Sequence, residues 1–229
     1  MRGRRTGARL ISLAFASAVS VLYVCWVRPR MLTWGATRDE ILHCYPGDEL
    51  VPDADSGSTM ATNLPAPPDR VWLWLVQMGG ERGGWYSWDW LDNDGKASAD
   101  RIVPGWQRLE QGQHLSRASV PGAQGPNWFT VEVLEPNRTL VLRSTYGMFS
   151  GVSFDPRIDP VPWAYIDGIW GFHLRETASG GTRLVVHSRS HSGPRPVALL
   201  FVLLLGEPLH FLMQTLQFRN LANRIAAEA

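Results

Sequence analysis

The chain has 229 residues, which suffices for one domain with appended segments. Its formal net charge is +1, from 22 basic and 21 acidic side chains, so no excess of positive charge indicates a polyanionic partner such as nucleic acid. Eleven tryptophans are many for this length. They indicate either the wall of a site for an organic ligand or one very aromatic core.

An apolar run near the N-terminus predicts a membrane anchor. Residues 10–27 carry no charge, four arginines precede them and Arg28 follows. Eighteen residues are about the minimum that crosses a hydrocarbon core of roughly 30 Å. A cleaved signal peptide is the alternative, but the end of the run holds the bulky Tyr23 and Trp26 where small residues would mark a cleavage site. We therefore expect residues 1–30 to be an uncleaved single-pass anchor with these two aromatic residues at the interface.

The distribution of charge around the apolar run favours one orientation in the membrane only slightly. Arginines lie on both sides of the run, and the excess before it slightly favours a cytoplasmic N-terminus with the domain outside the cytoplasm. Cys25 lies in the run and Cys44 stands alone, so no intrachain disulfide is expected and neither compartment is excluded.

The next segment differs from the rest in composition. Residues 31–57 are polar and rich in turn formers, which predicts a tether with one short helix from Thr37. A single domain is expected over residues 58–229. It begins with a short strand at 59–65, and the apolar spacing then predicts a helix over 69–78 that the following glycines end.

Beyond a second short helix at 87–92, alternating patterns predict a sheet. The strand candidates are residues 114–119, 128–134, 139–145, 163–176 and 182–190. The last two are joined by a TASGG hairpin turn, and a long helical stretch from Val197 to the C-terminus should cover the sheet.

The last hairpin predicts its own register, with Glu176 opposite Thr182. One face then carries apolar side chains: Trp170, Phe172, Leu174, Leu184 and Val186. The other face carries polar ones: His173, Arg175, Arg183, His187 and Arg189. So clean a division predicts an antiparallel sheet with one covered face and one solvent-facing face.

The element order indicates an α+β domain with a helix-grip fold, in which a curved antiparallel sheet wraps a long C-terminal helix behind an N-terminal transmembrane helix. Sheets of this kind leave an internal cavity between sheet and helix.

Several segments resemble bacterial members of the START-like superfamily, also called SRPBCC or polyketide cyclase-like proteins. They are GDELVPDAD at 47–55, APPDRVWLWLVQMG at 66–79, GGWYSWDWLDN at 83–93, ADRIVPGWQRLEQGQ at 99–113 and GGTRLVVHSRS at 180–190. The resemblance spans roughly residues 47–224, and its most specific piece is GWYSWDWL directly after the first helix. It implies a pocket for a hydrophobic ligand, in a superfamily that includes lipid carriers, hormone receptors and aromatase/cyclases. Two departures, the N-terminal run and the apolar residues 197–205, point toward a membrane.

The first functional hypothesis is a membrane-anchored START-like domain that binds a hydrophobic small molecule or lipid. The residues expected to line its aromatic cavity are Trp72, Trp85, Tyr86, Trp88, Trp90, Trp170, Phe172, Leu174 and Val186. No cofactor, metal or nucleic acid is expected, and the pattern does not determine the oligomeric state. A second hypothesis is a cyclase or dehydratase that uses Asp89 or Asp100 for proton transfer. A third is a non-catalytic membrane interaction protein whose tryptophans only fill a core.

Structural roles compete with several of these signals. Asp89 is expected to cap or pair within a turn, with Arg82 or Arg101 as a partner, because no matched acid and base are visible. His187 and His191 are about 13 Å apart on a strand and cannot share a metal, so solvent-facing histidines are the better interpretation. The glycines at 79–84 lack the context of a phosphate loop, and GMFSG at 147–151 is no nucleophile elbow.

The apolar run at residues 197–205 has nine residues, too few to span a bilayer. We expect it to be the buried start of the C-terminal helix. The alternative is an interfacial segment on the lipid surface.

Overall fold

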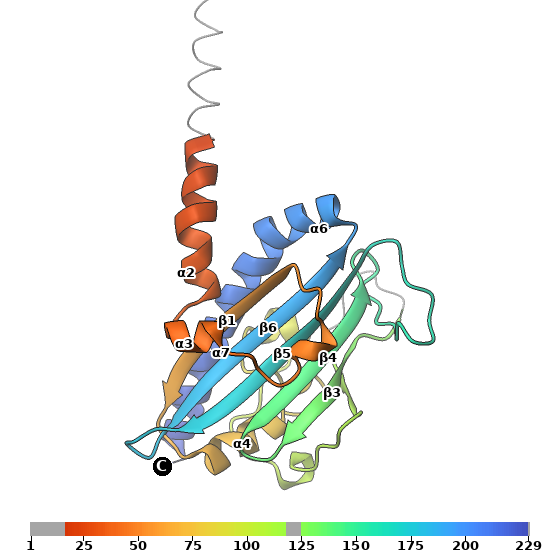
Figure 1. Ribbon diagram of the computed structural model, residues 1–229. Helices are drawn as coiled ribbons and strands as arrows, with labels where there is room; N and C mark the ends of the chain where they lie inside the picture. Colours follow the sequence, from red (N-terminus) through yellow and green to blue (C-terminus); the bar gives the residue numbers. More distant parts are fainter. Residues whose placement is uncertain (1–16, 118–124, 229) are drawn as a thin grey trace, which may run out of the picture.

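The computed structural model describes residues 17–117 and 125–228, and their framework is a six-stranded antiparallel sheet in the order β1-β6-β5-β4-β3-β2 (Figure 1). The strands are β1 (Ser56–Leu64), β2 (His114–Ser116), β3 (Trp128–Glu135), β4 (Thr139–Gly147), β5 (Tyr165–Glu176) and β6 (Thr182–Gly193). The two longest strands, β5 and β6, are neighbouring interior strands, and β1 and the short β2 form the edges.

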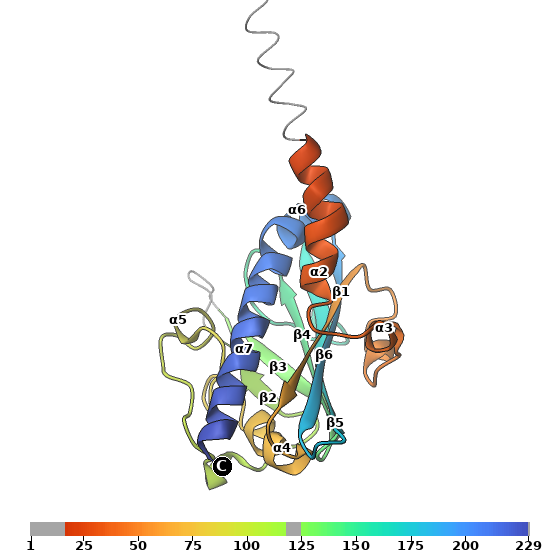
Figure 2. The same ribbon diagram turned by 90° about the vertical axis from the view of Figure 1, so that its left-hand side faces the viewer.

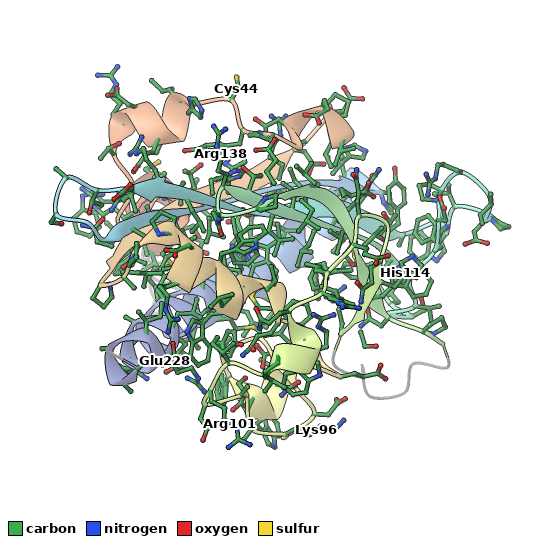
Figure 3. The ribbon with its side chains drawn as sticks, turned by 90° about the horizontal axis from the view of Figure 1, so that it is seen from below. Cys44, Lys96, Arg101, His114, Arg138 and Glu228 are labelled. Carbon is green, nitrogen blue, oxygen red and sulfur yellow. The ribbon has the colours of Figure 1, made fainter. Side chains whose placement is uncertain are left out.

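Helices and helical turns lie on both sides of this sheet. They are η1 (Tyr23–Val27), α2 (Arg28–Leu32), α3 (Arg38–Leu42), η2 (Asp48–Leu50), α4 (Pro68–Val76), α5 (Asp89–Asp92), η3 (Pro104–Trp106), α6 (Arg195–Phe201), η4 (Val202–Gly206) and α7 (Glu207–Ala227). The long α7 crosses one face of the sheet, and α3 lies on the opposite face (Figure 2). Seen from below, Cys44 is on one side of the sheet, and Lys96 and Arg101 are on the other (Figure 3). The expected α+β helix-grip architecture is confirmed.

The register of the last hairpin agrees with the sequence prediction. Glu176 pairs with Thr182, and Phe172 pairs with Val186 on the inner face toward α7. Phe172, Leu184 and Val186 are at most 1% exposed, so this part of the inner face is a closed hydrophobic core.

The opposite face is covered, and the expectation of solvent-facing histidines there is wrong. His173 is only 9% exposed, and the ring of Tyr45 lies 4.5 Å from its imidazole and 4.8 Å from that of His187. His187 also contacts Asp48 through Nε2 at 3.1 Å. These strand positions are polar, as predicted, but they contact Tyr45 and Asp48 instead of water.

Those partners come from the region that the sequence suggests as a tether. Thr37 caps α3 through its hydroxyl, and Glu40 returns the capping-box bond to the Thr37 backbone N–H at 2.8 Å. Glu40, Tyr45 and Val51 are buried against the sheet. Residues 36–51 therefore form an outer layer of the domain.

The N-terminal helix stands against the C-terminal one. Residues 10–16 of the predicted membrane run lie outside the described residues, whereas 17–32 are helical and include the π-helical turn η1. Arg28 donates to both carboxylate oxygens of Glu207, at 2.6 and 2.7 Å, and the Tyr23 hydroxyl donates to the carbonyl of Leu203 at 2.9 Å. These bonds fix the direction in which the helix leaves the domain (Figure 1).

The leucines at the start of the C-terminal helix are exposed and only Ala198 among the described side chains there is buried, which corrects the expectation for residues 197–205. Leu199, Leu200, Leu204 and Leu205 are 57 to 67% exposed. Among the described residues, the helix at Ala198–Ala227 is long and apolar enough to cross a membrane by length and composition, with 11% of its most apolar window buried.

Candidate functional site

Four aromatic side chains meet between the sheet and α7. Trp170 on β5 lies 4.7 Å from Phe172 and 5.7 Å from Phe129 on β3, measured between ring centroids. Trp85, from the glycine-rich turn after α4, completes the group at 5.1 Å from Phe129 and 5.8 Å from Trp170. We call Trp85, Phe129, Trp170 and Phe172 the aromatic cluster.

The turn that delivers Trp85 depends on glycine. Gly79 and Gly84 have φ values of 136° and 74°, and their backbones bond to each other in both directions. A Cβ on Gly84 would collide with the side chains of Ser98 and Asn93, so only glycine fits. The sequence signal of paired glycines thus corresponds to a tight return that places the aromatic segment beside α7.

A chain of buried amides connects the cluster to α7. The Trp170 indole N–H donates to Gln214 Oε1 at 3.0 Å, and Gln214 Nε2 donates to Gln217 Oε1 at 2.8 Å. Gln217 Nε2 in turn donates to the Trp85 carbonyl at 2.8 Å. Both glutamines are at most 1% exposed, so these bonds offset the cost of burying two polar side chains and hold the indoles in place.

The inner face becomes smaller and more polar toward α6. Gly168, Ser188 and Ser190 replace the large side chains found at Phe172 and Val186, and all three are half-buried. From α7, His210 reaches the Ser58 hydroxyl at 3.1 Å, and burial lowers the pKa of this histidine to about 4. It is therefore neutral at pH 7.

One cation lies at the edge of this region. Arg117, directly after β2, has its guanidinium 4.7 Å from the ring centroids of both Phe129 and Tyr146, and it donates to the Ser144 hydroxyl at 2.8 Å. Among the described residues, no carboxylate lies within 4.0 Å of it. A half-buried arginine over aromatic rings without an acidic partner is able to bind an anionic group.

The structure brings only part of the predicted ligand set together. Trp85, Trp170 and Phe172 belong to the aromatic cluster, with Leu174 and Val186 in the adjoining core. Trp72 and Tyr86 are buried in the same core, and the Tyr86 hydroxyl accepts from Gln77 Nε2 at 2.8 Å.

The other two predicted residues of the aromatic segment point outward. Trp88 is 45% and Trp90 is 75% exposed, apart from the cluster. The sequence analysis missed Phe129, Gln214 and Gln217. The strand period places Phe129 two residues from the buried Val131, and the i, i+3 spacing puts the two glutamines on one helix face, but neither pattern says what those faces contact.

The carboxylates of the aromatic segment have structural roles. Asp89 accepts hydrogen bonds from the backbone N–H and the hydroxyl of Ser98, which closes the 89–98 turn, so its partner is neither Arg82 nor Arg101. Asp100 is exposed. Burial raises the pKa of Asp92 to about 6, but Asp92 lies on α5 and is not part of the aromatic cluster. Among the described residues, no group of three or more potential metal-ligating His, Cys, Asp or Glu side chains occurs.

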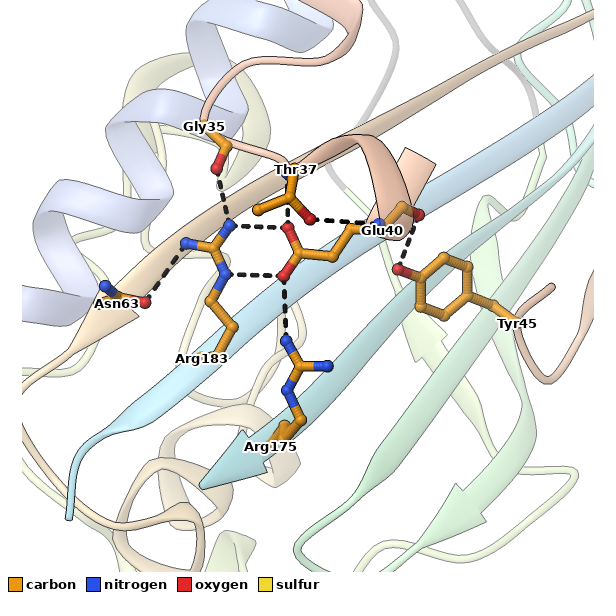
Figure 4. A network of polar contacts seen from close by, with 7 residues as sticks. All are labelled: Gly35, Thr37, Glu40, Tyr45, Asn63, Arg175 and Arg183. Carbon is orange, nitrogen blue, oxygen red and sulfur yellow. Dashed lines mark hydrogen bonds and ion pairs between the residues drawn. The ribbon is translucent and has the colours of Figure 1, made fainter. Parts of the chain in front are cut away.

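A separate cavity of about 700 Å³ lies on the outer face of the sheet. Glu40, Tyr45, His173 and Arg175 are among its lining residues, and Leu174 is the one member of the predicted ligand set that reaches it. Glu40 bonds to Arg183 at 2.7 and 2.8 Å, which lowers the pKa of this carboxyl to about 2 (Figure 4). With its charges paired in this way, the network fastens the outer layer to the sheet and does not resemble a site for an apolar ligand.

Several solved structures are similar to this chain at low sequence identity. No family model and no curated protein matches the chain. Protein MLL2253 from Mesorhizobium loti is 17% identical, over 76% of this chain and 99% of that protein, with a TM-score of 0.44. Protein NE0264 from Nitrosomonas europaea is 15% identical over 77% and 97%, and Ara h 8.0201 is 12% identical over 75% and 98%, both with TM-scores of 0.43.

At such TM-scores the likenesses carry no argument about ligand or activity. The fold is defined by the strand order and helix packing described above.

Proposed function

We propose that the chain is a membrane-anchored helix-grip domain that binds a hydrophobic small molecule or lipid between the sheet and α7. One observation carries the proposal: Phe129, Tyr146 and Trp170 lie on the inner face of the sheet but remain half-buried, whereas Phe172, on the same face, is completely buried. Aromatic surface that stays accessible inside the grip gains free energy when an apolar ligand covers it. Trp74, with 0% exposure, only fills the core, whereas Trp170 packs against the core and keeps part of its surface accessible.

Arg117 sets the chemistry of the ligand's polar end. Its guanidinium borders the aromatic surface, so an acidic group placed there would receive charge-assisted hydrogen bonds while the rest of the molecule covers Phe129 and Trp170. We therefore favour an amphiphile with one anionic end, such as a long-chain carboxylic acid, over a neutral hydrocarbon.

The apolar N-terminal run supports the anchor. In its described part, Val21, Val24 and Trp26 are 46 to 61% exposed, and none of these side chains has a place in the domain core. The Arg30 guanidinium stacks 3.9 Å above the Trp26 ring, a pairing suited to the boundary between lipid and water.

Ligand titrations of the full-length protein in lipid nanodiscs test the binding site. A long-chain fatty acid should change tryptophan emission and raise the melting temperature by an amount that grows with its concentration. Trp170→Phe should remove much of the emission change and leave the protein folded. Trp90→Phe, at an exposed position on α5, should keep the emission change. A response lost in Trp90→Phe and kept in Trp170→Phe would move the ligand outside the grip and contradict the proposal.

A further inference from the structure

A run of exposed apolar side chains lies on the helix that follows the sheet. Along α6 and η4, the side chains of Leu199, Leu200, Leu204 and Leu205 are 57 to 67% exposed. From Pro196 to Gly206 the chain has no charged residue. A run of adjacent exposed leucines is far more apolar than the surface of a soluble domain ordinarily is, so this surface has a partner.

The N-terminal helix lies directly beside this surface. The Tyr23 hydroxyl donates to the Leu203 carbonyl, and Arg28 forms an ion pair with Glu207. Residues 19–26 and 199–205 therefore adjoin at one end of the domain. The only acidic group at this junction, Glu207, is 5% exposed and neutralised by Arg28 among the described residues. The environment that receives the N-terminal helix must therefore also meet the leucines.

A second aromatic patch lies at the same end of the sheet. The register places Gly147, Tyr165 and Gly193 in one row, so the loop between β4 and β5 and the start of α6 leave the sheet together (Figure 1). In that loop Phe149 and Trp163 stack at 5.6 Å and are 64% and 72% exposed. Exposed aromatic residues are typical of the headgroup layer of a bilayer.

We infer that α6 and η4 form a second membrane contact, an in-plane helix whose leucines lie among lipid acyl chains beside the anchor. The inference depends on the anchor in the proposed function and adds the orientation of the domain. The rest of this helix, α7, packs on the sheet, so only the seven residues of α6 and the five of η4 are free to contact lipid. They measure about 18 Å, too short to span a core of roughly 30 Å but long enough for a helix lying in the plane of one leaflet. The half-buried Ser188 and Ser190 then lie at the end of the inner face that is nearest the lipid.

Site-specific labelling of the full chain in liposomes tests this contact. In a background in which Cys25 and Cys44 are replaced by serine, an environment-sensitive fluorophore is attached to Leu200→Cys, Leu204→Cys, Val21→Cys or Ser179→Cys. Val21 reports on the anchor, and Ser179, in the distant β5–β6 turn, is the aqueous control. Each label is quenched separately by aqueous iodide and by nitroxide-labelled lipids.

The labels at positions 200 and 204 should be quenched by the lipid nitroxides and several-fold less by iodide than the label at 179. If Val21→Cys is lipid-quenched and the two leucine positions are open to iodide, the second contact is refuted while the anchor stands. Shielding of the leucine positions from both quenchers would show that another protein surface, such as a second copy of the chain, covers them, and would also overturn the inference. An iodide-accessible Val21→Cys would contradict the anchor itself.

Discussion

The hydroxyl of Tyr23 donates to the backbone carbonyl of Leu203, a residue 180 positions later in the chain, at 2.9 Å. Both residues lie in π-helical turns, where the wider winding interrupts the regular i to i−4 bonds of a helix. The two π-helical turns are thus in contact, and the Tyr23 hydroxyl donates to a carbonyl within the second of them. This contact, with the Arg28–Glu207 pair one turn further on, makes the N-terminal helix part of the domain.

Loss of the Arg28 guanidinium should destabilise this junction. In Arg28→Gln the Glu207 carboxylate, which is 5% exposed, loses its charged partner, and we expect unfolding to be easier by about 2 kcal/mol. The double variant Arg28→Gln with Glu207→Gln should recover part of the loss because no buried charge remains unpaired. Arg30→Gln, at a neighbouring exposed position, is the control. Equal melting temperatures for Arg28→Gln and Arg30→Gln in detergent would show that the ion pair does not hold the helices together.

The sequence was sufficient to predict the sheet and its inner face. Strict alternation in β5 and β6 and the TASGG turn leave one register, which puts Trp170 and Phe172 on the core side. The paired glycines indicated the end of the first helix, but not that Trp85 lies beside α7.

The sequence pattern does not identify which distant segment of the chain covers a polar or apolar face. His173 and His187 looked solvent-facing because alternation identifies a polar face but not what covers it, and Tyr45 lies more than a hundred residues earlier. Gln214 and Gln217 looked like ordinary polar helix positions, since their partners, Trp170 and Trp85, are distant in the chain. Hydropathy alone also could not distinguish a buried leucine run from an exposed one at Leu199–Leu205.

Because the outer face of the sheet is covered, we expect His173→Asp to be strongly destabilising. The new carboxylate would be buried beside Tyr45 and near Asp48, without the solvent that an exposed position provides, at a cost of about 3 kcal/mol. Glu176→Gln, at an exposed position of the same strand, should change stability by less than about 0.5 kcal/mol. Urea unfolding monitored by tryptophan emission measures both; similar midpoints for the two variants would mean that residues 36–51 do not cover this face in solution.

We expect the difference in stability between the parent protein and Asp92→Asn to depend on pH. Burial raises the pKa of this carboxyl to about 6, so the folded state holds its proton more tightly than the unfolded state, whose value is near 3.8. Stability from this group is therefore complete below pH 4 and falls as the pH rises to 6. Asp92→Asn should be more stable than the parent by about 1–2 kcal/mol at pH 7, and this gain should shrink toward pH 4.

Thermal melts of the parent and Asp92→Asn between pH 4 and 8 measure the effect, with Asp100→Asn, at an exposed position, as the control. A pH-independent difference between parent and Asp92→Asn, or the same profile in Asp100→Asn, would show that the Asp92 carboxyl is not the titrating group.

The guanidinium of Arg117 gives the sharpest test of the ligand's chemistry. If it binds the acidic end of an amphiphile whose chain covers Phe129 and Trp170, Arg117→Gln should weaken binding of a long-chain fatty acid about tenfold, equivalent to about 1.4 kcal/mol. The fatty alcohol of equal length, which has no charge to lose, should bind the two proteins with nearly the same affinity. Arg101→Gln, at an exposed position with its side chain on the surface, should bind both ligands as the parent does. Emission titrations at fixed lipid content give the dissociation constants; an equal loss for acid and alcohol would mean that Arg117 only packs the edge of the sheet, and that the ligand's polar end lies elsewhere.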